Sequence, residues 1–215
     1  MVAIQYDHIW DCCCDHGLLG AALVAQQAAP HIHFVDVVPE LMLQLQRKLT
    51  RFFPQNECTQ SQWHVHCEDV ASLPLQKYKG KHLIIIAGVG GNLMSELVKN
   101  IFEQNPSLDM DFLLCPVLHQ YALRQQLIAL DLGLKSEVLI IDRKRYFEIL
   151  LVSNQENIES KISPVGSLLW QAHTAEQFKI SAGYLHKTLT HYRKVQLSDQ
   201  LDVQPIIDAY STVKL

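Results

Sequence analysis

The 215-residue sequence has no CxxC pair, so the cysteine spacing typical of a structural zinc site is absent. Three of its six cysteines are consecutive, and adjacent cysteines on a strand point to opposite faces and make poor disulfide partners. We therefore expect reduced thiols and a cytoplasmic protein. Cys12 and Cys14, flanked by His8 and His16, are more typical of buried core cysteines than of metal ligands, so no metal site is predicted.

Long apolar runs and an excess of basic residues are also lacking. No stretch reaches the roughly 18 residues that a membrane helix needs, and no basic segment followed by an apolar one marks a signal peptide. The formal net charge is -4, which excludes a global basic field that draws a protein onto nucleic acid. With 48% hydrophobic and 19% charged residues, we expect a globular protein without membrane contact, in which any nucleic-acid binding uses a local patch.

Apolar runs of strand length alternate with helix-like segments over most of the chain. Strands are predicted at residues 6–13, 31–37, 62–67, 82–87 and 111–115, with helices at 18–28, 39–52, 92–104 and 121–130. Residues 136–141 and 146–152 then form two strands whose connection permits only an antiparallel pair. A seven-stranded α/β sheet with its last strand antiparallel is typical of the Rossmann-like class I methyltransferase fold, whereas a nicotinamide-binding domain normally continues in parallel.

The character of the chain changes after this hairpin. We expect residues 1–153 to form the methyltransferase-like domain and residues 154–215 a short, coiled-coil-like helical appendage. Basic residues gather between 179 and 194, although the chain as a whole is acidic. Three of them are candidates for contact with RNA phosphates: Lys187, Arg193 and Lys194.

Acidic residues lie at the carboxyl ends of the first two predicted strands and just after the third. Asp11 precedes a loop in which the glycine slots of the generic acid-x-Gly-x-Gly-x-Gly pattern hold Cys13, Asp15 and Gly17. Asp36 lies 25 residues beyond Asp11 (36 - 11), where a carboxylate can accept both hydroxyls of a ribose. Asp69 follows the third strand and can accept from an adenine amino group. At each position an ordinary turn or a solvated strand end is the alternative.

Two further stretches are candidates for the substrate side. Gly88, Gly90 and Gly91 end the most apolar strand, and their spacing is not that of a phosphate-binding loop because no Lys-Ser or Lys-Thr follows. Such a turn can border the pocket of a methyl acceptor, or it can be a tight turn alone. The hairpin turn is basic and ends in an aromatic residue, which suits phosphate contact and base stacking as well as it suits a solvated turn: Arg143, Lys144, Arg145 and Tyr146.

These motifs together resemble the bacterial TrmK-type tRNA (adenine-N1)-methyltransferases, which modify the adenine at position 22. The family's Asp-Ile-Gly-Ser-Asp-His is matched by residues 11–16, and its Ile-Ala-Gly-Met-Gly-Gly by residues 86–91. Its Leu-Gln-Pro followed by Leu-Arg resembles Leu114-Cys115-Pro116 and Leu123-Arg124, and its Lys-x-Tyr-Glu-Ile resembles residues 143–149. The resemblance covers residues 7–152, and more loosely the helical tail.

The resemblance implies S-adenosyl-L-methionine (SAM) as methyl donor and tRNA as partner. It implies cofactor contacts from Asp11, Cys13, Gly17, Asp36, Asp69 and Ala87. It implies catalytic positions at Asp15, His16, Gly88 and Gly90. It also implies that the C-terminal helical domain helps to hold the tRNA. As RNA contacts we expect Gly91, Arg143, Lys144, Arg145, Tyr146, Lys187, Arg193 and Lys194.

Cys13 stands where the family motif has glycine. Three functions therefore remain open at this point. The first is a tRNA adenine-N1 methyltransferase, and the second is a methyltransferase on another substrate. The third is a non-catalytic relative with a degenerate SAM site that binds RNA or protein. SAM binding separates the third function from the other two.

Overall fold

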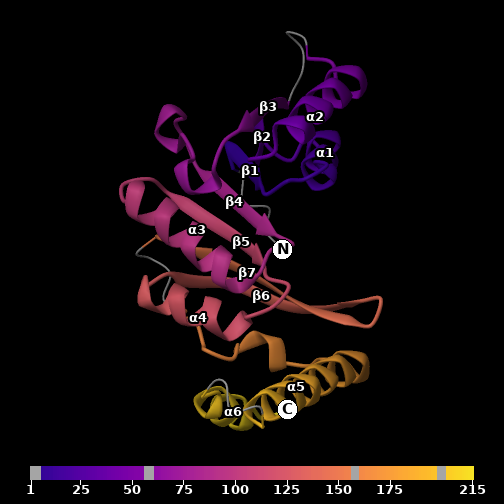
Figure 1. Ribbon diagram of the computed structural model, residues 1–215, viewed down its shortest axis with the longest axis vertical. Coiled ribbons are helices and arrows are strands. Elements are labelled where there is room, and N and C mark those ends of the chain that lie inside the picture. Colours follow the sequence, from indigo (N-terminus) through magenta and orange to yellow (C-terminus); the bar gives the residue numbers. More distant parts are fainter. Residues whose placement is uncertain (1–5, 56–60, 156–159, 198–201) are drawn as a thin grey trace.

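The structure is a computed structural model that describes residues 6–55, 61–155, 160–197 and 202–215. A single seven-stranded sheet, in the order β3-β2-β1-β4-β5-β7-β6, forms its centre (Figure 1). Strand β7 runs antiparallel to both β5 and β6, and the other described pairs are parallel, as predicted. The strands are β1 (His8–Cys12), β2 (His31–Asp36), β3 (Gln62–Cys67), β4 (His82–Ala87), β5 (Met110–Cys115), β6 (Gly133–Asp142) and β7 (Arg145–Ser153).

Helices cover both faces of the sheet, which explains why strand β4 is buried along almost its whole length. Apolar residues of α2 pack with those of β1 and β2 in one core cluster. The opposite face packs against α3 and α4 in a second cluster. The helices are α1 (Leu18–Ala25), α2 (Pro39–Phe52), α3 (Gly91–Gln104), α4 (Gln120–Ala129), α5 (Ala175–Gln196) and α6 (Gln204–Ser211), with short turns η1 (Val70–Ser72), η2 (Leu75–Lys77) and η3 (Leu168–Trp170).

Four predicted helix ends differ from the structure, and those of α4 (Gln120–Ala129, predicted as 121–130) differ by one residue each. The first helix stops at Ala25, three residues early, because Gln27 takes a left-handed conformation with φ of 52°. The helix predicted from Asn92 begins at Gly91, with Gly90 as its N-cap. The remaining predicted elements lie within three residues of the observed bounds.

The C-terminal helices pack against the edge of the sheet that β6 forms. Val165, Leu169, Trp170, Tyr184 and Tyr210 form a third buried cluster, against which residues of β6, β7 and α4 pack. The helical character predicted for the tail is confirmed. The division after residue 153 stays a prediction.

Arg124 of α4 lies completely buried beneath this C-terminal segment. Its guanidinium donates to Glu148 (2.8 Å) and Glu137 (2.7 Å), both buried. Glu137 also accepts from the backbone N–H groups of Ser167 and Leu168, while the Tyr184 hydroxyl donates to Glu148. One buried network therefore joins α4, the β6–β7 hairpin, η3 and α5.

Six histidines crowd one face of strands β1 to β4, and the sequence analysis did not recognise them as a group. Nε2 of His66 lies 3.0 Å from Nδ1 of His33, whose Nε2 lies 3.1 Å from Nδ1 of His8. Nε2 of His8 lies 3.2 Å from the Lys79 carbonyl, which can only accept. For neutral rings, each Nε2 along this chain must therefore carry the proton. We call the group the histidine stack: His8, His31, His33, His64, His66 and His82.

The cysteines of the described residues are free, and Cys12 and Cys14 are buried, as predicted. Cys58 lies outside the described residues. Within those ranges, no helix is both long and apolar enough to cross a membrane.

Candidate active site at the carboxyl edge of the sheet

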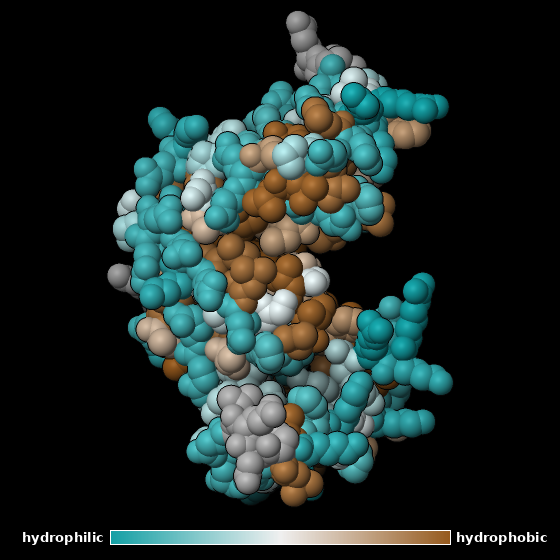
Figure 2. Space-filling view, in the orientation of Figure 1, coloured by the Kyte–Doolittle hydropathy of each residue, from teal (hydrophilic) through white to brown (hydrophobic). Residues whose placement is uncertain are grey.

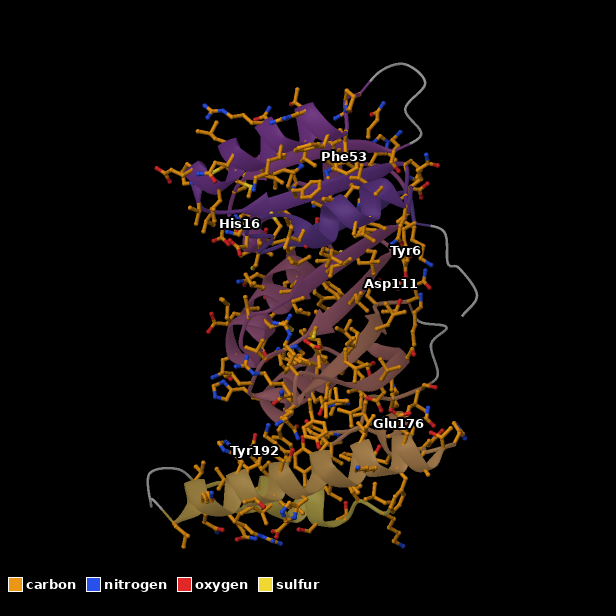
Figure 3. The ribbon with its side chains drawn as sticks, turned by 90° about the vertical axis from the view of Figure 1, so that its right-hand side faces the viewer. Tyr6, His16, Phe53, Asp111, Glu176 and Tyr192 are labelled. Atoms are coloured by element: carbon orange, nitrogen blue, oxygen red, sulfur yellow. The ribbon has the colours of Figure 1, made fainter. Side chains whose placement is uncertain are left out.

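The carboxyl ends of the parallel strands meet at one edge of the sheet, the position of ligand sites in open α/β folds. Figure 3 marks this edge by His16, with Tyr6 and Asp111 near the amino ends of the strands on the other side. Figure 2 shows the molecule hollowed between its α1–α2 end and its α5 end, with hydrophobic side chains on the floor of the hollow. The predicted site residues of β1, β2 and β4 all lie at this edge.

The loop after β1 keeps a glycine-like backbone although two of its three glycine slots hold other residues. Cys13, Asp15 and Gly17 all have left-handed conformations, with φ of 55°, 50° and 68°. Only Gly17 meets this without a steric cost, and a Cβ there would also collide with Leu45. The loop path that the motif requires is therefore present in this chain.

Asp11 lies buried beneath that loop. Its carboxylate accepts a 2.8 Å hydrogen bond from the N–H of Gly20, which fixes the start of α1 against the end of β1. Burial raises the pKa of Asp11 to about 6, against the opposite effect of the Gly20 bond. Asp11 thus ties α1 to the end of β1 across the loop.

The carboxylates predicted to hold the cofactor surround Cys13. Burial, reinforced by the carboxylates of Asp36, Asp11 and Asp69, raises the pKa of the Cys13 thiol to about 11. Asp36 accepts from the N–H groups of Asp15 (3.0 Å) and Val38 (3.2 Å). Both of its oxygens keep a further lone pair. The structure therefore brings together three strand ends as one acidic rim beside Cys13.

Asp69 has a structural task as well. Its carboxylate accepts a 2.9 Å bond from the N–H of Ala71 and so caps the short turn η1. This was the alternative interpretation of the residue. A carboxylate that caps a turn still has lone pairs for an adenine amino group, so the two roles are compatible.

The turn after β4 begins with an open position. Gly88 has a φ of 81°, and a Cβ placed on it would have no neighbour within 4 Å. Ala87 precedes it as the last residue of β4, and Gly90 packs beside Leu118. Gly91 is required for packing, because a Cβ there would collide with the His119 carbonyl. Gly88 can therefore receive a ligand, while Gly91 fixes the start of α3.

Asp15 and His16 lie exposed on the loop. Their side chains are 68% and 55% exposed, and His16 Nε2 lies 3.9 Å from Asp15 Oδ1. This exposure leaves both groups free to meet a substrate that approaches from solvent. Their catalytic roles stay predictions.

The structure brings together only some of the residues predicted to contact RNA. The β6–β7 hairpin turns through Arg143 and Lys144, whose φ values of 46° and 66° are those of a type I′ turn, which normally favours Asn-Gly. Arg145 and Tyr146 share a hollow with Lys187 of α5. Arg193 and Lys194 lie exposed about two turns further along α5.

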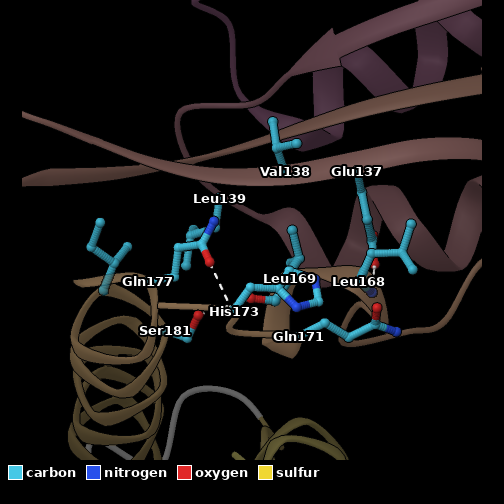
Figure 4. A pocket seen from close by; sticks show the side chains of 10 residues that line it. Glu137, Val138, Leu139, Leu168, Leu169, Gln171, His173, Gln177 and Ser181 are labelled. Atoms are coloured by element: carbon cyan, nitrogen blue, oxygen red, sulfur yellow. Dashed lines mark hydrogen bonds between the residues drawn. The ribbon is translucent and has the colours of Figure 1, made fainter. Parts of the chain in front are cut away.

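A second hollow, of about 300 Å³, lies between β6, η3 and the start of α5 (Figure 4). In it, His173 N–H donates to Gln177 at 2.8 Å. Glu137 lines the same hollow, but its carboxylate is already bonded to Arg124, Ser167 and Leu168. We interpret this hollow as the seam where the C-terminal helices meet the sheet.

The fold and this carboxyl edge define a methyltransferase domain. A family model described as "Methyltransferase domain" matches residues 1–150, and the chain belongs to that family. No curated protein matches the chain.

Solved structures refine this likeness. TrmK from B. subtilis, an m1A22 tRNA methyltransferase, has a TM-score of 0.64 at 18% identity, over 95% of this chain and 86% of that one. TrmK from M. capricolum, in complex with S-adenosyl-homocysteine, has the same TM-score at 17% identity, over 95% and 89%. Magnesium protoporphyrin IX methyltransferase from Synechocystis, with bound SAM, has a TM-score of 0.53 at 16% identity, over 72% of each chain. At these identities the likeness shows the fold.

Proposed function

We propose that this protein transfers a methyl group from SAM to N1 of the adenine at position 22 of a tRNA, in the cytoplasm. The observation that carries the proposal is the coverage of the structural match. The two TrmK structures match 95% of the chain, which reaches well into the C-terminal helices, whereas the porphyrin methyltransferase leaves more than a quarter unmatched. The division into a SAM-binding domain, residues 1–153, and a helical RNA-holding segment, residues 154–215, is part of this proposal.

The residues at the carboxyl edge fit SAM. Asp36 and Asp69 offer lone pairs to the ribose hydroxyls and the adenine amino group of SAM. The N–H groups of Cys14, Asp15 and Gly17 are bonded within the protein, so they fix the loop beside the cofactor. When bound, SAM supplies a methyl group that is already activated on a sulfonium. The protein then has to hold the acceptor in line with that methyl group and exclude water.

The acceptor adenine must leave any base stack before its N1 can react. The open backbone at Gly88 gives space for a flat ring beside the loop of Asp15 and His16. In this proposal the Asp15 carboxylate accepts from the adenine amino group and thereby orients N1. Substrate positioning, rather than covalent chemistry on the protein, supplies the rate.

Titration calorimetry with SAM is the first test. We expect saturable one-to-one binding, and Asp36→Asn, which keeps the shape of the side chain but loses its charge, to weaken it. No heat from protein shown to be folded by circular dichroism would contradict the proposal and favour the non-catalytic alternative.

Methyl transfer is the second test. With radiolabelled SAM we expect label in an unmodified tRNA transcript that carries adenine at position 22, and none in the same transcript with guanine there. Equal labelling of both transcripts would leave a methyltransferase but contradict the proposed acceptor.

A further inference from the structure

The hollow between the hairpin and α5 has walls from three separate parts of the chain. It encloses about 380 Å³, within the range of about 300–1,000 Å³ that is typical of small-ligand sites. Residues 117–120 come from the loop before α4 and its first residue, residues 145–147 from the start of β7, and the rest from α5. We call this hollow the hairpin pocket.

The side chains of the hairpin pocket are aromatic and basic. Tyr146 and Tyr184 lie with ring centroids 5.6 Å apart, and the Lys187 ammonium lies 5.5 Å from the Tyr146 ring centroid. His191 meets Tyr192 edge to face at 5.2 Å. Among the described residues that line the pocket there is no Asp or Glu. Flat rings beside cations, without acids, are the surroundings that a nucleobase and its phosphate prefer.

The hairpin pocket is directly connected to the proposed methyl-acceptor turn. The N–H of Gly91 donates to the Leu118 carbonyl at 2.8 Å, and the N–H of Val117 donates to the Val89 carbonyl at 3.0 Å. Both Val117 and Leu118 line the pocket and are exposed. These backbone bonds join one wall of the pocket to the glycine turn of residues 88–91.

Three residues in left-handed conformations lie in or next to the walls of the hairpin pocket. His119 caps α4 in a left-handed conformation with φ of 60°, and the hairpin turn places Arg143 and Lys144 where Asn-Gly is usual. Left-handed non-glycine residues cost stability, and such strain concentrates at functional sites.

We propose that the hairpin pocket stacks one unpaired base of the RNA substrate next to the target adenine, with the adjoining phosphate bound by Lys187 and Arg145. The proposal rests on the proposed function and deepens it. We assign the pocket to RNA and not to a free nucleotide. The reason is that the open carboxyl edge of the sheet continues from the pocket on the side of Gly91, so that one strand can occupy both. The pocket would hold the strand on one side while the target base leaves the stack.

The test measures tRNA binding by filter binding at several salt concentrations, with two pocket variants and one control. Lys187→Ala should reduce the magnitude of the slope of log affinity against log salt by about 1, as expected for the loss of one phosphate contact. His191→Ala should weaken binding by about fivefold or more. The control is Lys179→Ala, an exposed lysine on the same helix outside the pocket, which should leave binding as in the wild type. Both pocket variants should raise KM for tRNA and leave SAM affinity unchanged.

The outcomes separate this inference from the proposed function. If Lys187→Ala and His191→Ala bind and methylate tRNA like the wild type, the pocket assignment is wrong and the methyltransferase stands. If the folded wild type neither binds nor methylates tRNA, both proposals fail. The last measurement is a titration with adenosine monophosphate alone. If it binds as tightly as tRNA does, the pocket belongs to a free nucleotide and the inference is overturned.

Discussion

Cys13 is the residue at which this chain departs most from the family motif, and its backbone shows how the loop accommodates the change. The residue keeps a φ of 55°, so the loop retains the path that a glycine would give it. Its thiol is surrounded by carboxylates that, with burial, keep it protonated. Cys13 therefore adds a side chain at the carboxyl edge of the sheet on a backbone conformation that favours glycine.

Replacing Cys13 with glycine should stabilise the protein. A left-handed conformation costs roughly 1–2 kcal/mol for a residue with a Cβ, partly offset by the greater chain entropy of glycine when unfolded, about 0.5–1 kcal/mol. We expect the free energy of unfolding in urea to rise by roughly 1 kcal/mol and SAM affinity to rise as well. Cys13→Ala is the matched control, since it removes the thiol but keeps the Cβ. Equal behaviour of the two variants would show that backbone strain is not the cause.

The catalytic role proposed for Asp15 can also be tested with a single substitution. Asp15→Asn suits the left-handed backbone as well as aspartate does, so the loop should keep its shape. The lost charge should weaken the contact with the adenine amino group and misplace N1, which we expect to lower kcat by roughly 100-fold, while calorimetry shows SAM affinity little changed. Unchanged turnover would remove Asp15 from the catalytic residues.

At the scale of elements, the sequence predicted the features that depend on hydrophobic periodicity and on the residues at strand ends. The run Ile84-Ile85-Ile86 identified β4, and the short turn at Arg143-Lys144 identified the antiparallel pair. The histidine stack and the hairpin pocket could not be predicted, because residues up to 75 positions apart (192 - 117) meet only through strand register and helix docking. For the hairpin pocket the available signal was the aromatic residues among the basic ones between 179 and 194.

The histidine stack should make stability depend on pH. Burial, with repulsion between the rings, lowers the pKa of His33 and His64, the latter to about 4, and burial lowers that of His82 to about 4. The unfolded chain, with histidine pKa values near 6.5, therefore binds more protons than the folded protein between about pH 4 and 6.5. This contribution to stability is complete above pH 6.5 and is lost as the pH falls below it.

Urea unfolding at a series of pH values checks the sign. The completely buried His33 and His82 should each contribute a slope of up to about 1.4 kcal/mol per pH unit below pH 6. Nitrogen-15 spectra of the imidazoles at pH 7 should show the proton on Nε2 in His8, His33 and His66. Stack histidines that all titrate near 6.5 in the folded protein would contradict the prediction.

At the scale of the whole molecule, the Arg124 network joins the sheet domain to the C-terminal helices. Burial disfavours the ionised form of Glu137, but Arg124 and the N–H groups of Ser167 and Leu168 hold the pKa of this carboxyl below its usual value. The network thus fixes the position of α5 against the hairpin, and with it the hairpin pocket.

Arg124→Met should be strongly destabilising. The change leaves two buried carboxylates without their cation, which typically costs about 3–5 kcal/mol. We expect that loss in the free energy of unfolding, together with faster proteolysis between β7 and α5. Arg124→Lys keeps the charge but lacks the planar guanidinium. Its free energy of unfolding should therefore lie between those of the wild type and Arg124→Met. Wild-type stability in Arg124→Met would show that the network does not hold the segment.

Primer extension is the most direct test of the proposal that this protein methylates N1 of adenine 22 in tRNA. A methyl group on N1 blocks the pairing edge of adenine, so reverse transcriptase stops beside it. After incubation of an unmodified tRNA transcript with the protein and SAM, we predict a new stop next to position 22 that is absent without SAM and absent for Asp15→Asn. Read-through of that position by the wild-type reaction, or a SAM-dependent stop at another position alone, would contradict the account.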